Sequence, residues 1–187
     1  MEENCHVKYF RITPKQKLLN TYNLIYTRLN LDHWLDKAKS VIDLGCGKYG
    51  GMFNIKKFPT MIGIDPLWDA YGRNYCCPGV RQIIGKCNVF NCTDVVDAII
   101  ILNALNYFLL FQGFPDEILS HLQIGGVLIV YDILRDANQL GHGNKRIINK
   151  QIILKCFDKM KHEYGHTFRR DYYVGKYKAF AGVWRKV

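Results

Sequence analysis

The sequence predicts an α/β fold in which a mostly parallel, doubly wound sheet closes in an antiparallel hairpin. Apolar runs typical of strands alternate with helical stretches, the first such run ends in a glycine-rich turn, and the last residues alternate as two strands around Gly175. The chain has 187 residues, 49% of them hydrophobic, which suits one hydrophobic core. We therefore expect one domain over residues 1–187, with residues 1–39 as its N-terminal helical region.

Hydrophobic periodicity and turn residues place the individual elements. The first expected helix runs from Pro14 to Leu31, with Thr13 as its cap and Pro14 in its first turn. The expected strands are Val41–Leu44, Met61–Ile64, Arg81–Lys86, Asp97–Leu102 and Val127–Tyr131, the last one after a turn at Gly125-Gly126. The other expected elements are short helices at Gly51–Ile55 and Pro115–His121, a helix from Lys145 to Tyr164 capped by Gly165, and hairpin strands His166–Val174 and Tyr177–Lys186.

The turn after the first strand is the most informative segment. It reads Asp43-Leu44-Gly45-Cys46-Gly47-Lys48-Tyr49-Gly50, and such a turn brings backbone N–H groups to a ligand with no Cβ in the way. Asp65 ends the second strand about 20 residues further on, where a βαβ unit places a carboxylate on ribose hydroxyls. Asp43 just ahead of the glycines suits an ammonium better than a pyrophosphate. The pattern therefore favours S-adenosylmethionine (SAM) over a dinucleotide.

The net charge and the cysteines indicate which class of molecule the protein binds and in which cellular compartment it is expected. Lys and Arg total 26 against 16 for Asp and Glu, and this surplus favours nucleic acid ahead of a membrane surface. Lys15 and Lys17 are candidate RNA contacts, although a solvated basic face is the alternative interpretation. We expect a cytoplasmic protein, because no signal peptide or membrane span is recognisable. The seven cysteines are expected to be free thiols, with no metal site.

Several motifs together resemble the class I SAM-dependent methyltransferases, and among them the mRNA cap guanine-N7 methyltransferases. The segment from Asp43 to Gly51 is similar to motif I of that family, and Ile62–Asp65 resembles its second motif. Ala104-Leu105-Asn106-Tyr107-Phe108 resembles its Ala-Leu-His-Tyr-x-Phe stretch, with Asn106 in place of the histidine, and Leu122–Gly126 resembles its Leu-Lys-x-Gly-Gly turn. The resemblance implies a Rossmann-like, seven-stranded sheet with a C-terminal antiparallel hairpin, and it suggests a viral domain.

The resemblance also implies roles for individual residues. The implied SAM-binding residues are Asp43, Gly45, Cys46, Gly47, Asp65, Pro66, Asn88, Val89 and Asn103. The residues implied to position the reacting groups are Asn103, Asn106 and Tyr107, and the candidate substrate or RNA contacts are Lys15, Lys17, Tyr107 and His142. Capped RNA is the implied substrate, and other capping or replication proteins are further candidate partners.

The chemistry of the acceptor ranks the alternatives. Guanine N7 already carries a free lone pair, so transfer of a methyl group to it needs proximity and alignment rather than a side-chain base. A ribose 2′-hydroxyl must lose its proton, and Asn103 stands where the ribose methyltransferases have an aspartate, so this reaction ranks second among the RNA hypotheses. A small-molecule SAM-dependent methyltransferase and a non-catalytic RNA-binding module with the same fold remain alternatives.

Overall fold

The computed structural model describes residues 15–47, 50–67, 77–85, 92–109, 113–134, 148–172 and 175–187. Within these ranges, only the backbone is described for residues 15–18, 106, 169–172 and 175–177.

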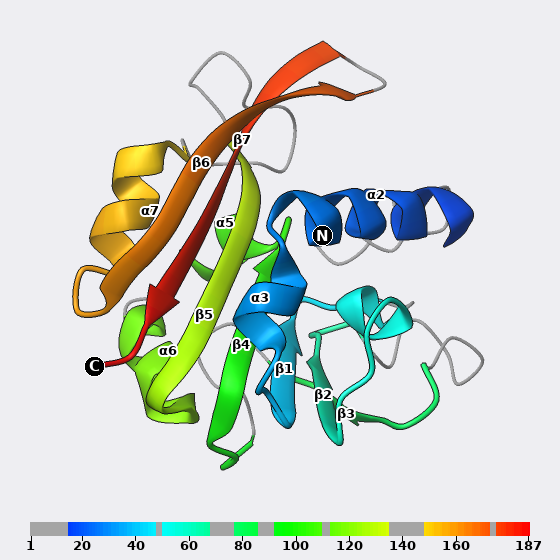
Figure 1. The fold of residues 1–187 in the computed structure, drawn as a ribbon, viewed down its shortest axis with the longest axis vertical. Helices are drawn as coiled ribbons and strands as arrows, with labels where there is room; N and C mark the ends of the chain where they lie inside the picture. Colours follow the sequence, from blue (N-terminus) through cyan, green and yellow to red (C-terminus); the bar gives the residue numbers. More distant parts are fainter. Residues whose placement is uncertain are drawn as a thin grey trace.

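A single seven-stranded sheet forms the centre of the molecule, with the strand order β3-β2-β1-β4-β5-β7-β6 (Figure 1). The strands are β1 (Ser40–Leu44), β2 (Thr60–Ile64), β3 (Val80–Ile83), β4 (Val96–Leu102), β5 (Leu122–Leu134), β6 (Lys161–Tyr172) and β7 (Gly175–Arg185). Strands β1 to β5 pair in parallel, and β7 lies antiparallel between β5 and β6. The predicted α/β sheet with a C-terminal antiparallel hairpin is confirmed.

Helices cover both faces of this sheet (Figure 1). One face carries α2 (Lys15–Arg28), α3 (Leu31–Leu35) and the 3₁₀ helix η1 (Gly51–Asn54); the other carries α5 (Leu105–Phe108), α6 (Phe114–His121) and α7 (Lys150–Cys156). Successive residues of β4 alternate between the two cores, with Ile99 and Ile101 in one and Ile100 in the other. Strands buried on both faces explain why the apolar runs in the sequence are continuous. Among the described residues, no helix is long and apolar enough to cross a membrane.

The predicted helix from Lys145 to Tyr164 is wrong in its second half. Helix α7 ends at Cys156, and β6 begins at Lys161. Gly165 is therefore not a helix cap but a residue inside β6, paired with Gly182 of β7. A Cβ on Gly165 would lie 2.7 Å from Nε2 of His162 and 3.2 Å from Cζ of Phe180. The glycine is needed because two rings occupy the space beside it.

Other element boundaries also differ from the prediction. Helix α2 ends at Arg28, because Asn30 has a left-handed φ of 48° and separates it from α3; Thr13 and Pro14 lie outside the described residues. Strand β3 ends at Ile83 instead of Lys86. Strand β5 already starts at Leu122. The turn predicted at Gly125-Gly126 is instead an irregularity within this strand, where its pairing with β4 shifts in register.

Candidate active site

The candidate site lies at the carboxyl ends of β1, β2 and β4. Strand β1 pairs with β2 on one side and with β4 on the other, so the chain builds the sheet in opposite directions from this point (Figure 1). In open α/β sheets, ligands bind at the carboxyl ends of the strands where the strand order reverses in this way. The glycine-rich turn after β1, Asp65 after β2 and Asn103 after β4 all lie at this edge.

The turn after β1 has a backbone that favours glycine. Gly45, Gly47 and Gly50 have φ values of 74°, 63° and 70°, which side chains rarely adopt. The N–H of Gly45 donates to the carbonyl of Ile64 at 2.7 Å, which joins the turn to the end of β2. A Cβ on Gly45 would lie 2.5 Å from Cβ of Ala104. The close contact with the segment after β4 is therefore possible only with glycine at this position.

Two buried carboxylates hold this turn. Asp65 accepts hydrogen bonds from the N–H of Gly47 at Oδ2 and from that of Leu67 at Oδ1, both at 2.9 Å. Asp43 accepts one at Oδ2 from the N–H of Met52 at 2.8 Å. Their exposed fractions are 2% for Asp43 and 5% for Asp65. The two carboxylates thus fix the start of the turn and the beginning of η1 through backbone groups.

Burial makes this pair of acids electrostatically unusual. Burial raises the pKa of Asp43 to about 7, the hydrogen bond from Met52 opposes this shift, and the charge of Asp65 adds to it. Burial, together with both carboxylates, raises the pKa of the Cys46 thiol well above its usual value. Cys46 is therefore a neutral thiol and not a nucleophile. A positively charged group at this turn would relieve the repulsion between the two acids.

Asn103 ends β4 in a left-handed conformation, with a φ of 57°. Its N–H donates to the carbonyl of Tyr131 on β5 at 2.7 Å. Its side-chain oxygen Oδ1 is buried and, among the described residues, has no hydrogen-bond partner. A buried acceptor without a donor costs about 1–3 kcal/mol, and such groups are rare in folded proteins. Asn103 therefore presents an acceptor suited to an N–H or O–H group of a ligand.

The structure brings together Asp43, Gly45, Cys46, Gly47, Asp65 and Asn103, as the sequence predicts. Pro66 follows Asp65 and is exposed, while Tyr107 lies in α5 and packs half-buried against the core. Asn106, Lys15 and Lys17 lie in helices, but their side chains are outside the described part of the structure. Asn88, Val89 and His142 also lie outside the described residues, so their predicted roles stay predictions.

Asp132 lies at the carboxyl edge of the sheet, near the candidate site, and was not predicted from the sequence. It is fully buried in β5, directly after Tyr131, whose carbonyl accepts the hydrogen bond from Asn103. The signal was an acidic residue inside the apolar run Val130-Tyr131-Asp132-Ile133. Among the described residues, no group of three or more His, Cys, Asp or Glu side chains could hold a metal ion.

No protein-family model and no curated protein matches this sequence, but many solved structures do. The N-methyltransferase NodS from Bradyrhizobium japonicum WM9 is 15% identical with a TM-score of 0.70, covering 89% of this chain and 97% of that one. The PH0226 protein from Pyrococcus horikoshii OT3 is 16% identical with a TM-score of 0.66, covering 96% and 99%. Coclaurine N-methyltransferase, bound to N-methylheliamine and S-adenosylhomocysteine, is 13% identical with a TM-score of 0.65, covering 94% and 72%. At these identities the similarity establishes the fold alone, and that fold is the Rossmann-like fold of the class I SAM-dependent methyltransferases.

Proposed function

We propose that this protein is a SAM-dependent methyltransferase whose cofactor binds at the glycine turn after β1. The observation that carries the proposal is the arrangement of Asp43, Asp65 and Asn103 around that turn: two buried carboxylates and one buried carbonyl oxygen that has no partner in the described part of the chain. Buried acceptors and negative charges call for a ligand that brings donors and positive charge. SAM fits, because it carries an ammonium and a sulfonium and has no phosphate.

Each residue of the site has a role that its geometry supports. The backbone N–H groups of Gly47 and Leu67 hold the carboxylate of Asp65 at the end of β2, and a carboxylate held there is the kind of acceptor that suits ribose hydroxyls. Asp43 acts on the turn through Met52, rather than touching the cofactor through that oxygen, and a cationic ligand at the turn would favour its ionised form. Asn103 offers Oδ1 to an N–H of the bound reactants. When bound, SAM supplies the electrophilic methyl group, and the chain's own residues orient it.

We favour RNA as the methyl acceptor, with N7 of a cap guanine as the receiving atom. The surplus of ten positive charges supports a polyanionic substrate. A ring nitrogen with a free lone pair needs only alignment with the methyl group, so the site requires no group to remove a proton. Methylation of a cap ribose ranks lower, because a 2′-hydroxyl must be deprotonated and β4 ends in Asn103, an amide that is no base.

A small amine is the second candidate acceptor, and one observation favours it. NodS and coclaurine N-methyltransferase, two of the proteins with the same fold, are named as N-methyltransferases, and the latter is bound to a small N-methylated ligand. The buried side-chain oxygen of Asn103, which has no partner among the residues that the structure describes, would also suit an amine N–H.

The experiment offers radiolabelled SAM with four kinds of acceptor: short RNAs with an unmethylated guanosine cap, with an N7-methylated cap or with no cap, and a panel of small primary and secondary amines. Nuclease digestion then locates the label on the RNA. Label on the cap guanine alone supports N7 transfer, whereas label on the ribose of the premethylated cap supports the ribose reaction. Label on amines alone moves the small-molecule reaction to first place. SAM binding without any transfer would support a non-catalytic RNA-binding module.

A further inference from the structure

A row of aromatic and cationic side chains lies where β6 meets α2 and α3. The ring centroids of Trp34 and Tyr164 are 6.4 Å apart, and those of His166 and Phe168 are 4.6 Å apart. The guanidinium carbon of Arg28 lies 5.6 Å from the centroid of the Phe168 ring. We call Arg28, Trp34, Tyr164, His166 and Phe168 the aromatic row.

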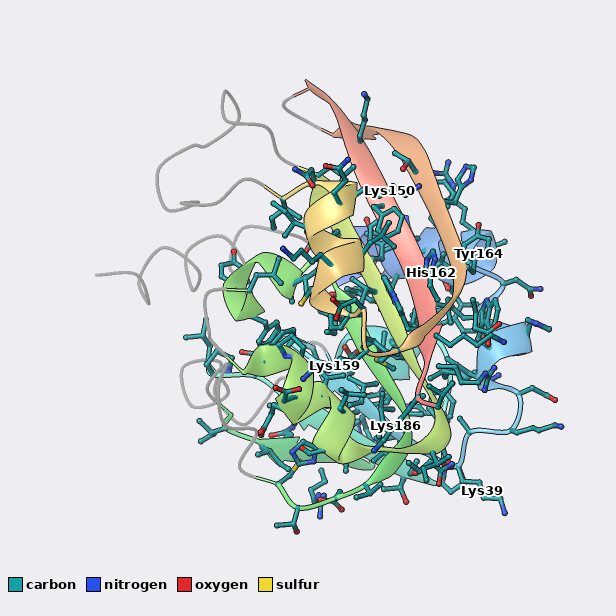
Figure 2. All side chains as sticks on the ribbon, turned by 90° about the vertical axis from the view of Figure 1, so that its left-hand side faces the viewer. Lys39, Lys150, Lys159, His162, Tyr164 and Lys186 are labelled. Atoms are coloured by element: carbon teal, nitrogen blue, oxygen red, sulfur yellow. The ribbon has the colours of Figure 1, made fainter. Side chains whose placement is uncertain are left out.

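The aromatic row is a surface feature and not part of the buried core. Tyr164, His166 and Phe168 are spaced two residues apart on β6, so their side chains lie on one face of that strand. Trp34, Tyr164 and Phe168 pack half-buried against the core under α2 and α3, while His166 and Arg28 are exposed. Figure 2 shows Tyr164 on the side of β6 toward α3, away from Lys150 and Lys159 on the α7 side.

The charges around the aromatic row favour a polyanion. Three carboxylates lie within two residues of it in sequence, and two of them are already paired: Asp32 lies 2.7 Å from Nζ of Lys56, and Glu163 lies 3.1 Å from Nζ of Lys161, whereas Asp36 is exposed. The guanidinium of Arg28 faces a ring. Aromatic rings beside cations are the combination with which proteins bind single-stranded nucleic acid, since bases stack on the rings and phosphates meet the cations. An acidic peptide would use the cations but would leave the rings without a stacking partner.

The aromatic row also lies on a path toward the candidate site. Strand β6 pairs antiparallel with β7, which pairs antiparallel with β5, so β6 and β5 run in the same direction. Phe168, near the carboxyl end of β6, is therefore nearer than Trp34 to the sheet edge that carries the glycine turn and Asn103. A nucleic acid strand lying along the row would point toward this edge and would reach Asn103 by crossing the ends of β7 and β5, which lie between β6 and β4 (Figure 1).

We propose that the aromatic row binds single-stranded RNA, with bases stacked on Tyr164, His166 and Phe168 and a phosphate beside Arg28. This binding deepens the RNA form of the proposed function and rests on it for its purpose, but it requires neither SAM nor a cap. It can therefore be measured apart from methyl transfer.

The test is fluorescence anisotropy with a labelled, uncapped oligouridine of 15 nucleotides at two salt concentrations. The variants are Arg28→Gln, which removes the cation, Phe168→Leu, which keeps an apolar side chain but removes the ring, and His166→Ala at an exposed position. The matched control is Lys159→Gln, since Lys159 is exposed, pairs with Asp116, and lies on the other side of the sheet. Thermal melts of all variants check that they remain folded.

We expect each variant of the aromatic row to weaken binding at least about fivefold, and Arg28→Gln also to lessen the salt dependence. The control should bind like the wild type, and a blunt RNA duplex should bind more weakly than the single strand. Equal weakening by the control, duplex binding as tight as single-strand binding, or displacement of the probe by polyglutamate at matched charge would overturn the proposal. RNA binding that survives while no acceptor is methylated would count against the proposed enzyme and not against the aromatic row.

Discussion

The carboxylate of Asp65 accepts a hydrogen bond from the N–H of Gly47 at 2.9 Å, which ties the end of β2 to the turn after β1. These two strands are neighbours in the sheet, and the pairing of Leu44 with Ile64 brings their ends level. Because the turn can reach Asp65 only with a left-handed backbone at Gly47, the acid and the glycine depend on one another. The glycine turn and Asp65 therefore form one folded unit in which each part holds the other in place.

Replacing Asp65 is predicted to remove SAM binding without unfolding the protein. Asp65→Ala removes the acceptor for the ribose hydroxyls and leaves the N–H of Gly47 unpaired, so the SAM affinity should fall at least about tenfold. Isothermal titration calorimetry measures the affinity. Asp97→Ala is the matched control, because Asp97 accepts hydrogen bonds from Lys39 and Ser40 at the opposite edge of the sheet. The control should lose stability but keep its affinity for SAM; loss of affinity in both variants would show a general effect of unfolding.

Gly45→Ala is predicted to destabilise the fold by about 2–4 kcal/mol, because it adds a backbone strain and a steric clash. The strain comes from the φ of 74°, and the clash from a new Cβ 2.5 Å from that of Ala104. Gly125→Ala separates the two effects, since Gly125 has a φ of 80° but, in the described part of the protein, no atom within 4 Å of its Cβ position. It should cost only about 1–2 kcal/mol. Urea denaturation measures both, and equal losses would mean that the contact with Ala104 contributes nothing.

Stability is predicted to decrease as the pH rises from about 4 to 7, on account of Asp43. The unfolded chain loses this proton near the ordinary pKa of 3.8, whereas the folded protein holds it to about 7. The folded state therefore binds more protons between these values, and its stability falls by about 2–4 kcal/mol as the pH rises. Asp43→Asn should remove this slope. A wild type and a variant with parallel pH profiles from chemical denaturation would show that Asp43 is ionised throughout.

Asn103→Gly is predicted to separate function from stability. Glycine tolerates the left-handed φ of 57°, and the variant loses a side-chain oxygen that has no partner among the described residues. The melting temperature should therefore stay the same or rise, while kcat/KM for methyl transfer should fall about tenfold or more through the lost hydrogen bond. An enzyme that melts earlier but turns over normally would show that Asn103 serves the fold alone.

The sequence alone was sufficient to predict the site residues that directly follow the buried strands. The apolar residues of β1, β2 and β4 form uninterrupted runs in the sequence because these strands are buried on both faces. Their carboxyl ends lie at the same edge of the sheet because the strands pair in parallel. Asp43, the glycines and Asp65 could therefore be placed from their spacing. The close fit of Gly45 to Ala104 could not, since it depends on how the chain packs after β4.

The parts that sequence patterns missed depend on register. Asp132 lies beside the end of β4 because Leu102 pairs with Tyr131, and no sequence pattern gives that register. The change from α7 to β6 was missed because a register shift between His162 and Tyr164 interrupts the alternation typical of a strand. The contact between Trp34 and Tyr164 joins two segments that are far apart in the sequence, so it follows only from the position of β6 at the edge of the sheet.

The most direct test of SAM binding at the glycine turn is the titration of the wild-type protein and of Asp65→Ala with SAM, in parallel with S-adenosylhomocysteine. A SAM site at the glycine turn predicts saturable binding of one SAM per chain, competition by S-adenosylhomocysteine, and an affinity at least about tenfold weaker in the variant. A folded wild-type protein that binds neither compound, or a variant that binds both as tightly as the wild type does, would contradict the assignment of the glycine turn as a SAM site.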